Sequence, residues 1–206
     1  MRVNRLVLAT RNPGKILEFS RILEEISPGL IELVGLADFP ALHDVEETGS
    51  TFLENALLKA RTVSAETGLP AIADDSGLCV DALGGSPGIF SARWSGKHGN
   101  DRANVEKVLS QLEGVPEGER GAHFTCVAAF AATDGSFLSE EGILQGRILN
   151  APIGANGFGY DPIFAPSGSL LSLAEFVESA KDAISHRGQA LRVIAPRITA
   201  MLSSLR

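Results

Sequence analysis

The sequence has few of the residues that mark several common protein classes. Its two cysteines, Cys79 and Cys126, lie inside apolar runs, and two isolated cysteines form neither a disulfide framework nor a zinc pattern. Apolar runs long enough to span a membrane are lacking, as is a signal-peptide pattern near Met1. We therefore expect a cytoplasmic protein that does not bind membranes.

Basic residues are also scarce. Eighteen Lys and Arg residues stand against 25 Asp and Glu residues, which gives a net charge of -7 and an isoelectric point near 5.1. A protein that wraps nucleic acid needs a basic surface, so we expect no nucleic-acid partner. An anionic small molecule stays compatible with this charge, because a few lysines in one cleft can reverse the local field.

The apolar residues that are present follow an alternating strand and helix pattern. Continuous apolar runs predict strands, residues at three- and four-residue spacing predict helices, and Thr133-Asp134-Gly135 predicts a hairpin turn. We expect strands at 6–9, 31–34 and 71–73, a hairpin of 124–132 and 137–149, and helices at 16–26, 52–63, 101–112 and twice near the C-terminus, separated by Ser185–Gly188. This order predicts an α/β protein with a mixed sheet covered by helices, in a single domain over residues 1–206.

Two adjacent carboxylates follow the apolar run Ala71-Ile72-Ala73. We interpret this segment as a strand that delivers Asp74, Asp75 and Ser76 onto a glycine turn at Gly77. Carboxylates at the end of a buried strand are costly to desolvate unless a cation or hydrogen-bond donors compensate them. The segment therefore indicates a divalent-metal or acid/base site. A solvated turn is the ordinary alternative, since Asp, Ser and Gly are common turn residues.

The loop before the first predicted helix has the features of an anion site. Backbone N–H groups at a helix start attract anions, Thr10 and Asn12 add neutral donors, and Lys15 adds a positive charge. The P-loop spacing is absent, and an ordinary strand-to-helix turn is the alternative. The helix at 52–63, which Thr48, Ser50 or Thr51 caps, carries Asn55 and Lys59 on one face.

Acidic and aromatic segments complete the candidate site. Glu46 and Glu47 are two possible second carboxylates for a magnesium ion bound by Asp75, since Mg²⁺ prefers hard oxygen ligands. Glycines on both sides of Phe158 leave its ring open for stacking on a base, although a core phenylalanine in a tight turn is the alternative. Lys181, His186 and Arg187 offer donors to a phosphate or a base carbonyl, or form a capping cluster.

Together these segments resemble the inosine/xanthosine triphosphate pyrophosphatase family, also called Ham1-like. The resemblance rests on five stretches that cover most of the chain: LATRNPGK, EETGSTFLENALLKA, LPAIADDSGLCVDALGGSPGIFSARWSG, NGFGYDPIF and KDAISHRGQAL. It implies an elongated two-lobed fold with the active site in the cleft between lobes, and a homodimer. It also implies magnesium-dependent hydrolysis of ITP, dITP and XTP to the monophosphate and pyrophosphate.

The resemblance assigns roles to individual residues. Asp75 is the catalytic carboxylate at the metal, with Glu46 or Glu47 as its acidic partner, and Lys15 and Lys59 lie near the phosphates. The remaining substrate contacts are Thr10, Arg11, Asn12, Pro13 and Gly14 for the triphosphate, Ser76, the base pocket of Phe158, Gly159, Tyr160 and Asp161, and the closing residues Lys181, His186 and Arg187. Arg11 stands where many members have glycine, which puts the backbone geometry of the phosphate loop in question.

Base choice follows from hydrogen-bond polarity. Arg187 or His186 donates to the 6-keto oxygen of the purine, and Asp161 accepts from its N1–H, which adenine does not offer. The alternatives are a Maf-like pyrophosphatase of modified pyrimidine nucleotides and a non-catalytic nucleotide sensor. A haloacid dehalogenase phosphatase fits poorly, because Asp74-Asp75-Ser76 lacks the DxD spacing.

Overall fold

The computed structural model describes residues 4–204, and the chain divides into two compact units. Unit 1 is built from residues 4–75, 126–142 and 187–204, and unit 2 from residues 76–125 and 143–186. The chain therefore passes between the units four times, and one passage falls between Asp75 and Ser76.

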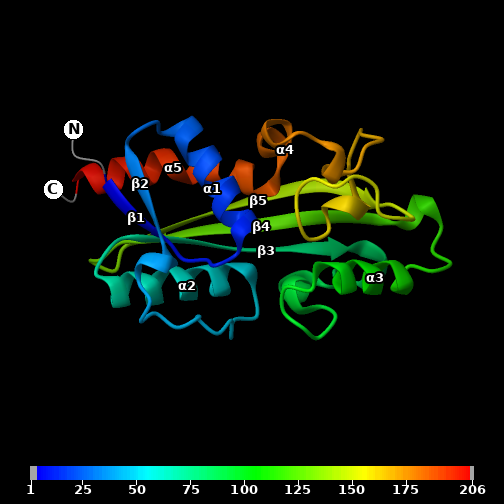
Figure 1. The fold of residues 1–206 in the computed structure, drawn as a ribbon, viewed down its shortest axis with the longest axis horizontal. Helices are drawn as coiled ribbons and strands as arrows, with labels where there is room; N and C mark the ends of the chain where they lie inside the picture. Colours follow the sequence, from blue (N-terminus) through cyan, green and yellow to red (C-terminus); the bar gives the residue numbers. More distant parts are fainter. Residues whose placement is uncertain (1–3, 205–206) are drawn as a thin grey trace. The chain divides into compact units, whose positions relative to one another are not determined.

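A mixed sheet of six strands has the order β2-β1-β3-β4-β5-β6 (Figure 1). Its strands are β1 (Asn4–Leu8), β2 (Ile31–Gly35), β3 (Ala71–Val80), β4 (Gly121–Ala131), β5 (Phe137–Ile148) and β6 (Phe164–Pro166). Strand β1 pairs in parallel with both β2 and β3, whereas β6 pairs antiparallel with β5. The predicted α/β class and mixed sheet are confirmed.

In unit 1 the strands bury both faces, because successive side chains of a strand point to opposite sides. The helices α1 (Pro13–Ile26) and α5 (His186–Ser204) pack on the face that carries Leu6, Ile72 and Phe130. Helix α2 (Phe52–Thr67) packs on the other face, against Val7, Ala71 and their neighbours. Figure 1 shows α1 and α5 on one side of these strands and α2 on the other.

Unit 2 has a core of its own. The inward side chains of its strands, among them Leu78, Phe124 and Phe164, pack against Val105 and Val108 of α3 (Asp101–Gln111). The short helix α4 (Glu178–Ile184) adds Ile184 to the edge of this cluster. Irregular segments, including the loop of 154–160, and short 3₁₀ helices connect these elements.

Helix ends follow the chemistry of the sequence. Asn12 caps α1, its side chain accepting the Lys15 backbone N–H, and Pro13 fills the first helical position. Of the three candidate caps of α2, the structure selects Thr51, which forms a capping box with Glu54. Gly68 ends α2 in the left-handed conformation, with φ of 65°.

The glycine turn that we predicted after Asp75 is wrong. Strand β3 continues without a break from Ala71 to Val80, so Asp74 and Asp75 lie in the middle of the strand. Gly77 serves a close approach instead of a turn, because a Cβ atom there would lie 2.2 Å from the Gly88 carbonyl oxygen. Backbone packing against the 86–91 segment explains this glycine.

The predicted separation of the two C-terminal helices is also too wide. Only Ser185 separates α4 from α5, so His186, Arg187 and Gly188 form the first turn of α5. This position lets Arg187 project from a rigid helix. Within residues 4–204, none of the helices combines the length and the apolar character needed to cross a membrane.

The packing of the unit 1 core predicts how much stability is lost when a core side chain is shortened to alanine. Phe130 has no exposed surface, so we expect Phe130→Ala to lower the free energy of unfolding by about 3–5 kcal/mol. Phe137, in the same hairpin, is 47% exposed, and Phe137→Ala should cost about 1 kcal/mol or less. Urea denaturation of both variants measures the difference, and equal losses would contradict this account of the core.

Candidate active site

The pleat of β3 sends its two aspartates in opposite directions. Asp74 lies on the same face of the sheet as Ile72, toward α1 and α5. Asp75 lies on the face of Ala71 and Ala73, toward α2. Both side chains are buried, with 1% and 5% of their surface exposed. Each carboxylate therefore needs its own partners, and different helices supply them.

Asp75 meets two side chains of α2. Its Oδ1 lies 3.0 Å from Lys59 Nζ, and its Oδ2 accepts a hydrogen bond of 3.2 Å from Asn55 Nδ2. Asn55 and Lys59 share a helix face because they are four residues apart. The ammonium of Lys59 also lies 3.0 Å from Glu47 Oε1, so one cation bridges two carboxylates.

The segment before α2 is fastened to the same helix. Asn55 Oδ1 accepts the Gly49 backbone N–H at 2.8 Å, and Glu54 accepts bonds from Ser50 and Thr51. Glu47 is thereby brought near Lys59, whereas Glu46 is exposed. Of the two glutamates that the sequence left open, Glu47 is the one beside Asp75 and Lys59.

Asp74 meets three side chains on the opposite face. Its Oδ2 lies 3.0 Å from Lys15 Nζ, accepts a bond of 3.0 Å from Arg187, and receives the Cys126 thiol at 3.8 Å. Arg187 is buried and also pairs with Glu18 of α1. Burial opposes the charge of Arg187, but the carboxylates of Asp74 and Glu18 outweigh it and raise the pKa of the guanidinium.

The predicted phosphate loop runs from the end of β1 into α1. Thr10 Oγ1 accepts the Asn12 backbone N–H at 3.2 Å. Asn12 accepts the N–H groups of Lys15 and Ile16, and Pro13 has no N–H, so the Gly14 N–H is the first-turn donor that remains for an anion. Pro13 and Gly14 form the first helical turn. Arg11 points elsewhere: it bonds to Asp44 and to the Leu42 carbonyl.

Burial and neighbouring charges shift the pKa values of Asp75 and Lys59. Burial raises the pKa of Asp75 above its ordinary value, and this effect outweighs the lowering by Lys59 and Lys15. Burial acts against the charge of Lys59 too, yet the carboxylates of Asp75, Asp74 and Glu47 raise its pKa. Lys59 therefore stays positive, and Asp75 is held at a cost in folding free energy.

The charges of this cluster suit a further cation. Lys15, Lys59 and Arg187 face four carboxylates, those of Glu18, Glu47, Asp74 and Asp75. Oxygens of Glu47 and Asp75 already converge on one positive atom, Lys59 Nζ, and such hard oxygen donors fit magnesium. Among residues 4–204, no three His, Cys, Asp or Glu side chains are gathered in a metal-binding group. Any ion would therefore keep water or substrate oxygens as further ligands.

Unit 2 carries a separate polar cluster around Asp161. Its Oδ2 accepts the Phe158 backbone N–H at 2.9 Å and pairs with Lys181 Nζ at 2.5 Å. Lys181 Nζ also lies 4.8 Å from the centre of the Phe158 ring. Asp161 and Lys181 are both buried, so an acceptor and a donor stand side by side next to an aromatic ring.

The other predicted residues of unit 2 are held by packing. Tyr160 is buried and donates to the Ser91 carbonyl at 2.8 Å; burial, with a smaller contribution from Asp101, raises the pKa of its hydroxyl. His186 stacks on Phe124 at 4.8 Å between ring centres. Ser76 is half-buried in β3.

The predicted site residues thus fall into two groups. Lys15, Lys59, Asp75 and Glu47 come together in unit 1, and Phe158, Tyr160, Asp161 and Lys181 in unit 2, while the segment around His186 and Arg187 is divided. That all of them share one cleft stays a prediction. Sequence reasoning missed Glu18, which pairs with Arg187, and Cys126, whose thiol donates to Asp74. The only signal for Glu18 was its place one turn after Lys15 and one turn before the buried Ile22.

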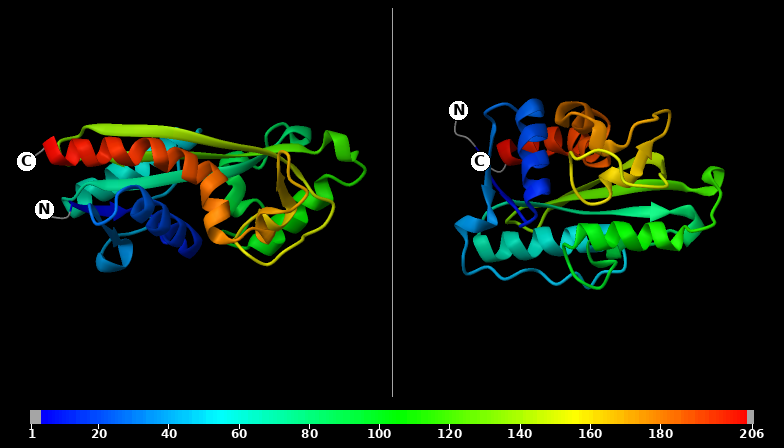
Figure 2. Two further views of the ribbon diagram at one scale, coloured as in Figure 1. Left: turned by 90° about the horizontal axis from the view of Figure 1, so that it is seen from above. Right: turned by 45° about the vertical axis from the view of Figure 1, so that its right-hand side comes forward.

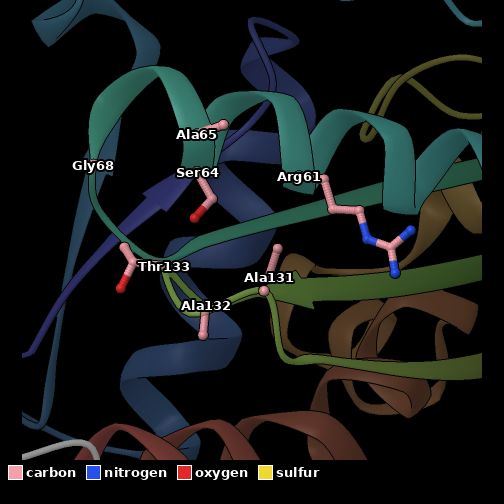
Figure 3. Close-up of a pocket in the computed structure, with 8 residues that line it drawn as sticks. Arg61, Ser64, Ala65, Gly68, Ala131, Ala132 and Thr133 are labelled. Atoms are coloured by element: carbon pink, nitrogen blue, oxygen red, sulfur yellow. The ribbon is translucent and has the colours of Figure 1, made fainter.

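A hollow of about 270 Å³ in unit 1 lies away from these groups. It is lined by the end of α2 and the β4–β5 turn, with Arg61, Ala65 and Ala131 among its residues (Figure 3). Arg61 is held over the Phe137 ring, 4.6 Å from its centre. None of the predicted site residues lines this hollow, so it carries no part of the candidate chemistry.

Comparisons with known proteins agree with one another. A model described as the Ham1 family matches residues 6–197. The chain is 54% identical to the dITP/XTP pyrophosphatase of Streptomyces avermitilis over 201 residues, 97% of this chain and all of that protein. A HAM1 protein structure from Coxiella burnetii has 42% identity and a TM-score of 0.84, covering 96% of this chain and all of that one. The crystal structure of a nucleoside-triphosphatase, dITP/XTP pyrophosphatase, from Mycobacterium abscessus has 48% identity and a TM-score of 0.75, with 94% and 99% coverage.

The raised pKa of Asp75 predicts that its charge destabilises the fold. Folding favours the protonated form, so this carboxyl contributes stability below its unfolded pKa and loses it as the pH rises through the folded pKa. Asp75→Asn should therefore raise the free energy of unfolding at neutral pH. The gain should shrink as the pH falls and the wild-type carboxyl becomes protonated.

Urea denaturation of both proteins at several pH values measures this. Asp38→Asn, an exposed carboxylate of the same unit, is the matched control and should change little. A less stable Asp75→Asn protein at neutral pH would contradict the assignment.

Proposed function

Because the chain belongs to the Ham1 family, we propose that it hydrolyses the non-canonical purine nucleotides ITP, dITP and XTP to monophosphate and pyrophosphate with magnesium. The proposal is supported by the names of the relatives, dITP/XTP pyrophosphatase, at identities near 50% over almost the full chain. The observation that carries it is the bridging of Asp75 and Glu47 by Lys59 of α2. The homodimer implied by the resemblance and the cytoplasmic location expected from the sequence belong to the same proposal.

The charge of the unit 1 cluster supports the need for a metal ion. Its carboxylates outnumber its cations, and a triphosphate would bring further negative charge. Asp75 and Glu47 would hold magnesium, which when bound neutralises phosphate charge and polarises phosphoryl oxygens. Lys59, which those two carboxylates now hold, would then be available to the phosphates.

The residues of unit 1 suit attack of water on the α-phosphorus. Asp75 orients the water and accepts its proton, the new bond forms at phosphorus, and the bond to the bridging oxygen breaks as pyrophosphate leaves. Asn55 keeps Asp75 in place through its amide. Lys15 and Lys59 offset charge on the equatorial and leaving oxygens, and the Gly14 N–H at the start of α1 donates to the phosphate chain.

The residues of unit 2 suit a 6-keto purine. Lys181 donates to the 6-keto oxygen, Asp161 accepts from N1–H, and the Phe158 ring stacks on the base. Adenine presents a donor at C6 and a bare acceptor at N1, so both partners would be mismatched. The sequence alone assigned the keto contact to Arg187 or His186. The Arg187 guanidinium bonds to Asp74 and Glu18, and the His186 ring stacks on Phe124, whereas Lys181 lies beside Asp161.

A substrate panel tests the reaction. Pyrophosphate release should be seen from ITP, dITP and XTP with magnesium, should be lost when EDTA is added, and should be far slower with ATP. Asp75→Asn should lower turnover by about a hundredfold or more, because positioning and electrostatics provide most of the catalysis in phosphoryl transfer. Asp38→Asn should retain wild-type turnover. Metal-independent hydrolysis, or release of orthophosphate alone, would overturn the proposal.

A second variant tests the base contacts. Asp161→Asn keeps one oxygen for the Phe158 N–H but presents an amide donor to the base. We expect kcat/KM for ITP to fall by roughly tenfold or more while that for ATP falls less, so that the ratio of the two narrows. Steady-state kinetics with both nucleotides measure the ratio. An unchanged ratio would show that Asp161 does not read the base.

A further inference from the structure

The loop that carries the candidate base site is bonded to a carboxylate that lies outside that site. Asp101, the first residue of α3, accepts the Gly159 backbone N–H at 2.9 Å through Oδ2. The two residues are 58 positions apart, and both belong to unit 2. In the left view of Figure 2 the yellow loop passes beside the green helix α3.

The glycines of this loop make its backbone flexible unless a hydrogen bond such as that of Asp101 restricts it. Gly157 and Gly159 have φ values of 74° and 61°, in the left-handed region where glycine is favoured, and glycine has the most conformational entropy to lose on folding. A Cβ atom on Gly157 would lie 2.0 Å from Asp161 Oδ2, so a side chain there would collide with the carboxylate of the base site. The loop therefore keeps glycine at these positions, and other contacts must restrict its backbone.

Three hydrogen bonds limit that freedom in consecutive residues. The Phe158 N–H bonds to Asp161, the Gly159 N–H bonds to Asp101, and the Tyr160 hydroxyl bonds to the Ser91 carbonyl. The first of these is internal to the loop, and the third acts through a long side chain. The bond of Asp101 fixes the peptide between the stacking ring and the buried tyrosine to a helix.

We propose that Asp101 is a positioning residue for base binding: through the Gly159 amide it holds Phe158 and Asp161 in the geometry that receives the purine. This inference rests on the proposed function, since it assigns that loop to the base. A carboxylate accepting a backbone N–H is a charge-assisted hydrogen bond and is stronger than a neutral one. Asp101 itself does not contact the nucleotide.

A purely structural role for Asp101 must be separated from this one. An acidic residue in the first turn stabilises a helix through its dipole, and Asp101 stands at that position of α3. The neighbouring Asn100 supports the same helix end, since its Oδ1 accepts the Ala103 N–H at 3.2 Å. Asn100→Ala is therefore the matched control, because it weakens the start of α3 and leaves the bond to Gly159 in place.

Hydrogen exchange tests the contact itself. In Asp101→Ala we expect the peptide covering residues 154–162 to exchange about tenfold faster, because a charge-assisted bond is worth roughly 1.5 kcal/mol. Asn100→Ala should speed exchange in α3 and not in the loop. Asp101→Asn keeps an acceptor oxygen and should recover most of the protection. Loop exchange that is unchanged in Asp101→Ala would overturn the proposal.

Kinetics test the consequence for base binding. Asp101→Ala should raise KM for ITP about five- to tenfold with kcat within about twofold of wild type, and Asp101→Asn should restore most of the affinity. Inhibition by magnesium tripolyphosphate, which has no base, should be unchanged. The control Asn100→Ala should keep the wild-type KM.

The outcomes separate this inference from the proposed function. If the wild-type protein releases no pyrophosphate from ITP, the proposed function fails, and exchange in the loop still tests the contact. If the wild type is active and Asp101→Ala keeps its KM, or weakens tripolyphosphate inhibition equally, the positioning role is refuted. A rise in KM that Asn100→Ala reproduces would assign the effect to the helix.

Discussion

The neutralisation of two consecutive buried aspartates in β3 is the constraint on which unit 1 depends. Adjacent residues of a strand face opposite sides, so Asp74 and Asp75 form their direct ion pairs with cations of different helices. Asp75 takes Lys59 from α2, whereas Asp74 takes Lys15 and Arg187 from α1 and α5. Docking of these three helices and assembly of the charged cluster are therefore one event.

The polar cluster of unit 2 differs from that of unit 1 in the kind of interaction that holds it. The cluster of unit 2 includes the buried ion pair of Asp161 and Lys181, and backbone N–H groups of its loop bond to the carboxylates of Asp161 and Asp101. Hydrogen bonds have direction, which suits recognition of a planar base, whereas the many charges of unit 1 suit a phosphate chain. The passage of the chain between Asp75 and Ser76 joins these two kinds of chemistry in a single strand.

Local patterns in the sequence predicted most of the fold. The apolar runs and helical spacings predicted the α/β class, and Thr51, one of the three candidate caps, marks the start of α2. The predicted turn at Gly77 failed because its cause, the nearby carbonyl of Gly88, lies eleven residues away and leaves no local mark. The break around His186 failed for a similar reason: a single serine is enough to end one helix and start the next.

The sequence predicted which residues belong to the candidate site better than it predicted which of them contact one another. Motifs indicated the carboxylates and lysines, but the choice of Glu47 over Glu46 depends on how Asn55 and Glu54 fasten the preceding segment. The partners of Arg187 could not be foreseen, since Glu18 lies 169 positions away along the chain. Spacing in a sequence carries no record of such distances.

The wide span of the Arg187 pairing has a consequence during synthesis on the ribosome. Glu18 and Asp74 are translated early, yet the guanidinium that joins them arrives 113 residues after Asp74. Until then the nascent polypeptide holds two carboxylates whose burial lacks that compensation, which disfavours closing of the core around them. Synthesis of the first turn of α5 is thus the step that supplies the missing positive charge.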